Sequence, residues 1–176
     1  MARQARIFML LQGPSGDIRG ESEVVPMQGW IELEDWRWQL DAGSRHADRE
    51  AVQPSVLSIS KRMDRATTAM LQAMRRADVL RASLCMQDAS LQDFDLTLKL
   101  DKVRITHYEM HTESGALGMR IEERWTLDYD SVLFSYRPDH KAGVMQVALV
   151  RPPGSSTLPP PAHDPPEKTR AAQELP

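Results

Sequence analysis

Three of the four tryptophans of this 176-residue chain lie within nine residues near its N-terminus, and this cluster strongly constrains the fold. Trp36 and Trp38 alternate with polar residues, a period of two that places large apolar side chains on one face of a strand. Ile31 and Leu33 alternate in the opposite phase, so the two faces must exchange places near Glu34. One extra residue produces that exchange, and we therefore predict a strand bent by a β-bulge.

The other face of this bent strand is polar, because it carries Asp35, Arg37 and Gln39. A ligand-binding aromatic box would need exposed ring faces. The alternation instead favours a core position for Trp36 and Trp38, with the polar face left available at the surface.

Further alternating segments follow, among them one that places Trp125 and Leu127 in the predicted core. Between two of these segments, Ala66, Met70 and Ala73 recur at helical spacing behind a cap at Asp64 or Thr67. Many short strands with one helix predict a mainly β fold, an antiparallel β-barrel of two packed sheets with one short α-helix. The expected strands are 5–11, 30–40, 56–62, 80–87, 94–100, 102–110, 122–129, 131–137 and 144–150.

Composition changes towards the C-terminus, since eight of the twelve prolines lie between Pro152 and Pro176. We expect a β-barrel domain over residues 1–151 and a Pro-rich, extended or disordered tail over 152–176. The net charge of -3 with mixed signs argues against a general nucleic-acid binder. The single cysteine, Cys85, excludes an internal disulfide framework and indicates a buried, inert thiol.

The N-terminal apolar run, Ile7 to Leu11, is shorter than the roughly 7–15 apolar residues of a signal peptide. No run approaches the roughly 18 apolar residues of a membrane span. We therefore expect a cytoplasmic protein without membrane insertion, whose export would need a machine that does not read signal peptides.

The sequence has one cluster that resembles a metal site, His107, Glu109 and His111 on one face of a strand. The outer two would lie about 13 Å apart at roughly 3.3 Å per residue, too far for one metal ion. A solvated strand end is the favoured interpretation. No catalytic spacing is recognisable, and Ser22 has no local base to activate it, so we expect no catalytic residues, no metal, no cofactor and no enzyme activity.

Four ordered segments resemble the Hcp family, the tube-forming ring proteins of bacterial type VI secretion. The first is Gly-Glu-Ser at 20–22 followed by Trp-Ile-Glu-Leu at 30–33 and Trp-Arg-Trp at 36–38. The others are a strand ending in Lys61 before a helix start, a central hairpin from Phe94 to Tyr108, and a closing strand pair over 123–138. The chain departs from the family pattern at Ala77, where the family usually has glycine, and in its last strand and tail.

This resemblance implies a homohexameric ring that stacks head to tail into a tube, secreted in a type VI-dependent manner. Its implied partners are further copies of itself, a tip spike protein, a contractile sheath and effector proteins carried in the lumen. Asp17, Gly20, Glu21 and Ser22 would then lie in ring or stacking loops, and Asp35, Arg37 and Gln39 would face the lumen. A monomeric β-barrel that binds a small ligand and a metal-dependent barrel enzyme are the alternatives.

Overall fold

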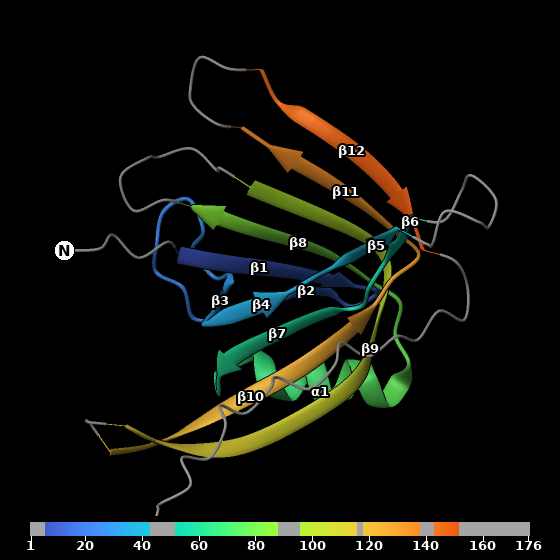
Figure 1. Cartoon of the computed structure of the whole chain (residues 1–176). Coiled ribbons are helices and arrows are strands. Elements are labelled where there is room, and N and C mark those ends of the chain that lie inside the picture. Colours follow the sequence, from blue (N-terminus) through green and yellow to red (C-terminus); the bar gives the residue numbers. More distant parts are fainter. Residues whose placement is uncertain (1–5, 43–51, 88–95, 116–117, 138–142, 152–176) are drawn as a thin grey trace, which may run out of the picture.

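The computed structural model describes residues 6–42, 52–87, 96–115, 118–137 and 143–151, which form antiparallel strands around one helix (Figure 1). A mainly β fold with one helix was predicted and is confirmed. The elements are β1 (Arg6–Gly13), β2 (Gly16–Ile18), β3 (Ile31–Leu33), β4 (Asp35–Arg37), β5 (Leu40–Ala42), β6 (Val52–Pro54), β7 (Leu57–Arg62), α1 (Ala66–Arg76), β8 (Leu80–Gln87), β9 (Leu96–Gly115), β10 (Gly118–Asp128), β11 (Ser131–Tyr136) and β12 (Met145–Val150).

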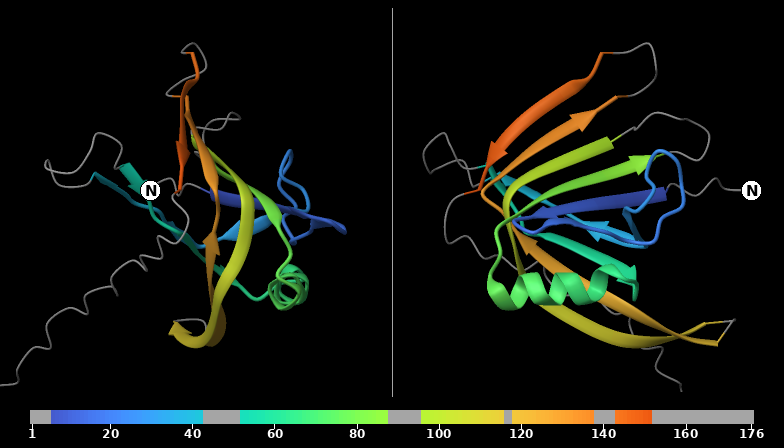
Figure 2. Two further views of the ribbon diagram at one scale, coloured as in Figure 1. Left: turned by 90° about the vertical axis from the view of Figure 1, so that its right-hand side faces the viewer. Right: turned by 180° about the vertical axis from the view of Figure 1, so that it is seen from behind.

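The strands form two walls that share the long strand β9 (Figure 2). The first wall runs β1-β8-β9-β11-β12, with β2 and β3 also paired to β1, and the second runs β9-β10-β7-β4. Lys102 has a φ of 52° where β9 passes from one wall to the other. The hairpin predicted between 94–100 and 102–110 is therefore wrong, because the chain bends there without reversing; Phe94 lies outside the described residues.

The tryptophan-rich segment also passes from wall to wall. Ile31 pairs with Met9 of β1, whereas Trp36 pairs with Ile59 of β7. The Glu34 amide between them donates to a β7 carbonyl at 2.9 Å. The predicted exchange of faces occurs, but a change of partner strand produces it in place of a β-bulge.

The predicted closed barrel needs correction. In the described part of the chain, the hydrogen-bonded order ends at β4 on one side and at β2 and β3 on the other. Strands β3 and β4 follow each other along the chain but are not paired with each other. The two walls are therefore connected there by the backbone of Glu34 and not by strand-to-strand hydrogen bonds between β3 and β4. Strands β5 and β6 also pair with each other, in a part of the chain where no strand was expected between residues 40 and 56.

The core lies between the two walls and is closed from below by α1 (Figure 1). The helix contributes Ala66, Met70 and Ala73 to that core, as their spacing predicts. It ends at Ala77, whose φ of 54° and ψ of 37° are left-handed. No helix in the described ranges is long and apolar enough to cross a membrane.

Candidate functional site

The side of the second wall that points away from the core collects most of the polar residues singled out from the sequence. Strand pairing sets Asp35 beside Ser60, Ser60 beside Arg124, and Arg124 beside Glu109. Each of these residues alternates with a neighbour that packs against or within the core, so the four side chains share the opposite side of the sheet.

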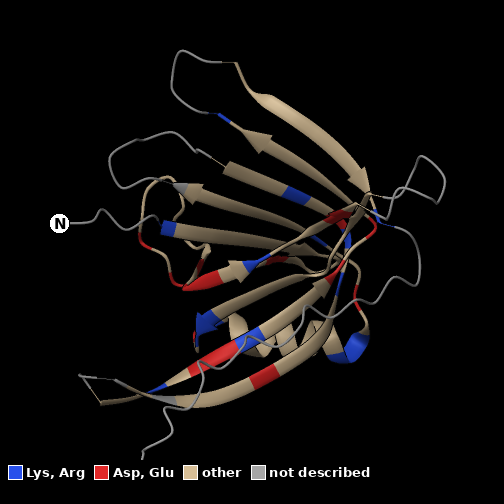
Figure 3. Cartoon of the chain, in the orientation of Figure 1, with Lys and Arg blue, Asp and Glu red and all other residues tan. Residues whose placement is uncertain are grey.

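Two further rows run parallel to the first. Pairing across the same four strands gives the row Arg37, Ser58, Thr126 and His107, and across β7, β10 and β9 the row Arg62, Glu122 and His111. Together the three rows form a continuous surface, here called the polar face. Figure 3 shows acidic and basic residues interspersed on these strands.

Ion pairs along one edge of the polar face are mostly long, and each joins a half-buried carboxylate to a partly or largely exposed basic side chain. Arg62 Nε lies 2.6 Å from Glu34 Oε1, whereas Arg124 and His111 each lie 3.7 Å from Glu122. Pairs of this kind at a protein surface contribute roughly 0–1 kcal/mol each. The face is therefore a hydrated surface of mixed charge.

The three residues considered for a metal site lie on the polar face. His107 and Glu109 are exposed, and His111 is half-buried beside Glu122. Within the described ranges, no group of three or more His, Cys, Asp or Glu side chains is arranged to hold a metal ion.

The remaining predicted residues of the tryptophan segment lie at the edge of the core. Trp36 and Trp38 are partly buried and pack against the core, whereas Trp125 and Leu127 are fully buried within it. Trp38 stacks on Phe134 with ring centroids 6.1 Å apart. Gln39 is exposed beyond the end of β4.

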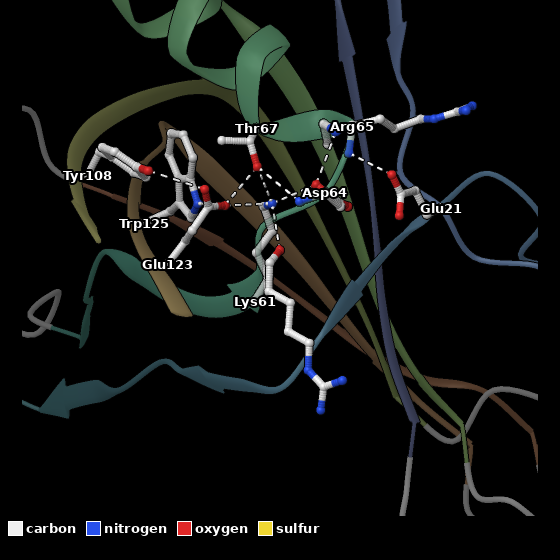
Figure 4. Close-up of polar contacts among 10 residues, drawn as sticks. Glu21, Lys61, Asp64, Arg65, Thr67, Tyr108, Glu123 and Trp125 are labelled. Atoms are coloured by element: carbon white, nitrogen blue, oxygen red, sulfur yellow. Dashed lines mark hydrogen bonds and ion pairs between the residues drawn. The ribbon is translucent and has the colours of Figure 1, made fainter. Parts of the chain in front are cut away.

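Directly beneath the polar face lies a buried ion pair between Lys61 of β7 and Glu123 of β10 (Figure 4). The Lys61 Nζ and Glu123 Oε2 atoms are 2.7 Å apart, and both side chains are 0% exposed. Lys61 Nζ also lies 2.6 Å from Asp64 Oδ1 and donates to Thr67 Oγ1 at 2.9 Å. Two carboxylates and a hydroxyl thus surround a single buried ammonium.

Glu123 receives further hydrogen bonds that tie other elements to this pair. Thr67 of α1 donates to Oε2 at 2.9 Å, Tyr108 of β9 donates to Oε1 at 3.2 Å, and the Trp125 indole donates to Oε2 at 3.4 Å. The network thereby connects three strands with the first turn of the helix (Figure 4). A buried charge is tolerated only when it is paired and hydrogen-bonded in this way.

The Gly-Glu-Ser segment at residues 20–22 contacts the start of α1, next to the Lys61–Glu123 network (Figure 4). Gly20 packs so closely that an added Cβ would lie 2.4 Å from the Trp30 carbonyl oxygen, and Ser22 is buried, with its hydroxyl accepting from the Val24 amide at 3.3 Å. The Glu21 carboxylate accepts a hydrogen bond from the Arg65 amide at the start of α1, at 3.0 Å.

The accessible side chains of the predicted interface loops are therefore those of Glu21 and Asp17. Both are exposed, and Asp17 accepts a hydrogen bond from Gln12 at 3.0 Å.

The Lys61–Glu123 pair was not predicted from the sequence, although the sequence carries a signal for it. Lys61 continues the buried alternation of Leu57 and Ile59, and Glu123 continues that of Trp125 and Leu127. Both charges therefore fall on core-facing positions of adjacent strands, and opposite charges in such positions indicate a buried pair.

A second buried polar cluster fixes the end of the described chain. Arg151 is buried, donates from Nε to the Pro54 carbonyl at 3.1 Å and pairs with Asp128. The Tyr129 hydroxyl donates to the Ser55 carbonyl at 2.6 Å and accepts from the Trp38 indole at 2.5 Å.

Burial shifts the pKa of two tyrosines in these clusters and of Cys85 in β8. It raises the pKa of Tyr129 to about 12, although the hydrogen bond from the Trp38 indole partly opposes this rise. Burial, followed by the charge of Glu123, raises the pKa of Tyr108. Burial also raises the pKa of Cys85, which is consistent with an unreactive thiol.

Comparison with known proteins places this chain in a family. A family model described as "Type VI secretion system effector, Hcp" matches residues 8–136. No curated protein sequence matches.

Solved structures agree with this assignment in fold. The Hcp1 protein from E. coli matches with a TM-score of 0.69 and 16% identity, over 82% of this chain and 99% of that one. Hcp1 from Salmonella typhimurium matches with a TM-score of 0.68 and 18% identity, over 84% and 95%. A type VI secretion system effector from Yersinia pestis matches with a TM-score of 0.66 and 21% identity, over 82% and 98%. The chain belongs to the Hcp family of type VI secretion system proteins.

Proposed function

We propose that this chain is the structural subunit of a secreted tube, in which six copies close a ring and rings stack head to tail. Its export would follow contraction of a sheath and would require no signal peptide. The domain up to residue 151 would build the ring, with the Pro-rich segment 152–176 as an appendage. The observation that carries the proposal is the family match over residues 8–136, together with a solidly filled core between the two walls.

The polar face is the surface that we assign to the lumen. Its three rows carry Arg37, Arg62 and Arg124 against Asp35, Glu109 and Glu122, so the two signs balance. A near-neutral, hydrated wall would let folded cargo pass without tight binding, because exposed mixed charges attract a partner only weakly. Six copies of Arg37 alone would line the lumen with positive charge. The acidic residues of the polar face offset that charge.

The stacking contacts would come from the turn and loop that flank β2. Asp17 and Glu21 are exposed there, whereas Gly20 and Ser22 support the loop from within. These exposed acidic side chains would meet the next ring, and the ends of the tube would meet the tip spike protein.

The two alternative functions find less support. A ligand-binding barrel needs an interior cavity, and here Trp125, Met9 and Met70 occupy the space between the walls and the helix. A metal-dependent enzyme needs convergent ligands, and His107, Glu109 and His111 follow one strand on an exposed surface. A structural role therefore fits the molecule better than catalysis or ligand storage.

Native mass spectrometry of the purified chain tests the assembly. The expected species has a mass near six times the 19.9 kDa of one chain. A chain that stays monomeric at tens of micromolar would overturn the proposal.

A further inference from the structure

The hairpin of β9 and β10 continues past the helix as a two-stranded arm (Figure 1). On its inner side, the Tyr108 and Trp125 rings lie 4.3 Å apart at the edge of the core. Strand alternation carries that same inner side outward to Met110, Ile121 and Met119, which are 53%, 39% and 76% exposed. The arm therefore extends the apolar side of the second wall into solvent.

Strands β11 and β12 extend the first wall in a similar way, and we call this extension the wing. Leu149 packs against the core beside Val132. Farther along, on the same side of the sheet, Tyr136, Met145 and Val147 are 41%, 63% and 47% exposed. Within the described residues, β12 pairs with β11 alone, so its outer edge is also open.

Both extensions lack charge on the side that continues the core. The arm presents methionine, isoleucine, threonine and serine there, and β12 consists of Met-Gln-Val-Ala-Leu-Val. Figure 3 shows no charged residue on β12, whereas the arm carries charges that belong to its outer, polar side. An open apolar strand at a sheet edge is a template for association unless something covers it.

We infer that the arm of one copy packs on the wing of the next copy, so that each covers the exposed apolar side of the other. The arm and the wing lie at opposite ends of the molecule in all three views (Figures 1 and 2). They belong to opposite walls, so an arm laid over a wing would continue the two-walled core from subunit to subunit. The inference rests on the proposed ring and names the surfaces that would build it.

A head-to-tail contact suits these surfaces better than a two-fold contact. A two-fold dimer through the arms would leave both wings uncovered, and one through the wings would leave both arms uncovered. A heterologous contact covers one arm and one wing at every junction, and it leaves none exposed when the ring closes.

Cysteine cross-linking tests which surfaces meet. Met119→Cys and Val147→Cys are made singly and together, and each protein is treated with a short bismaleimide. The unmodified chain is the control, since its Cys85 is buried. The double variant should give a ladder of covalent oligomers up to the full ring, and an equimolar mixture of the single variants should give covalent dimers only. Self-cross-linking of either single variant would overturn the inference in favour of a two-fold contact.

Charge insertion provides the second test. Met119→Arg and Val147→Arg should each reduce the native mass from the ring to the single chain without lowering its β content by circular dichroism. His107→Arg, on the polar side of the same strand β9, is the control and should keep the ring. If both charge variants still form rings, the inference fails while the proposed ring stands. If the unmodified chain itself is monomeric, the proposed function fails as well.

Discussion

Removing the buried ammonium at Lys61 should be among the most damaging single changes to this fold. In Lys61→Met, the Glu123 carboxylate keeps hydrogen bonds from Thr67, Tyr108 and Trp125 but loses the ammonium group that lies 2.7 Å from it. Breaking a buried ion pair by removing one partner costs about 3–5 kcal/mol. Because three hydrogen bonds to Glu123 remain, we expect a cost near the lower end of that range.

An exposed ion pair supplies the matched control. Arg6 and Glu32 lie 3.0 Å apart with side chains 48% and 47% exposed, and Arg6→Met should cost only about 0–1 kcal/mol. Both variants are measured by urea unfolding at one fixed protomer concentration, because assembly would otherwise add to the apparent stability.

A double-mutant cycle then isolates the pair itself. In Lys61→Met with Glu123→Gln no buried charge remains on either strand, so the double variant should be more stable than the sum of the single losses by about 1–3 kcal/mol. A cost for Lys61→Met no larger than that for Arg6→Met, or a cycle without coupling, would show that the buried pair does not stabilise the fold.

Four other predictions follow from the described contacts. Tyr129→Phe should cost about 1–3 kcal/mol, because the Ser55 carbonyl loses its donor. Since the pKa of Tyr129 is raised to about 12 from 10.0, its contribution is complete below about pH 10 and is lost as the pH rises through 12. Unfolding free energy against pH should therefore fall less steeply in this variant, and an unchanged slope would contradict the assignment. Ala77→Gly should raise the unfolding free energy by about 0.5–1 kcal/mol, because φ is 54° there, and a loss of stability would count against the left-handed cap. Arg37→Ala should change stability by less than about 0.5 kcal/mol and act on cargo retention in a secretion assay; a clear loss of melting temperature would place this side chain in a structural role instead. Truncation after Arg151 should leave melting and ring formation nearly unchanged, whereas removal of Arg151 as well should lower the melting temperature; equal effects of the two truncations would contradict its anchoring role.

Alternating patterns were enough to predict most strands and the helix. The opposite phases of Ile31–Leu33 and Trp36–Trp38 also located the crossing between the walls within one residue of Glu34. The physical reason is that burial of one sheet face imposes a period of two, whichever strand is the partner. The identity of that partner, β1 on one side and β7 on the other, depends on distant segments and left no local pattern.

The path of β9 could not be predicted from local residues. Lys102 has no glycine-like preference for positive φ, yet it takes a φ of 52° at the bend between the walls. The hairpin was expected from the family resemblance, and the polar pair at Asp101 and Lys102 is equally compatible with a turn. Tertiary packing decided between the two.

The candidate site was predictable in part. The polar residues Asp35 and Arg37 and the separate group around His107 were each recognised, but only the strand order β4-β7-β10-β9 places them on one surface. Lys61 and Glu123 lie in core-facing phase, but their residue types argue against core positions, because isolated buried charges are costly. Their mutual pairing removes the objection, and it becomes visible only once the strands are aligned.

Electron cryomicroscopy of the purified assembly would show both the number of subunits and the surface that lines the pore. We expect a closed ring of six subunits with a central pore lined by β4, β7, β10 and β9, so that Arg37 and Asp35 face the pore. A monomer, an open filament without a pore, or a ring whose pore is lined by the first wall would contradict it.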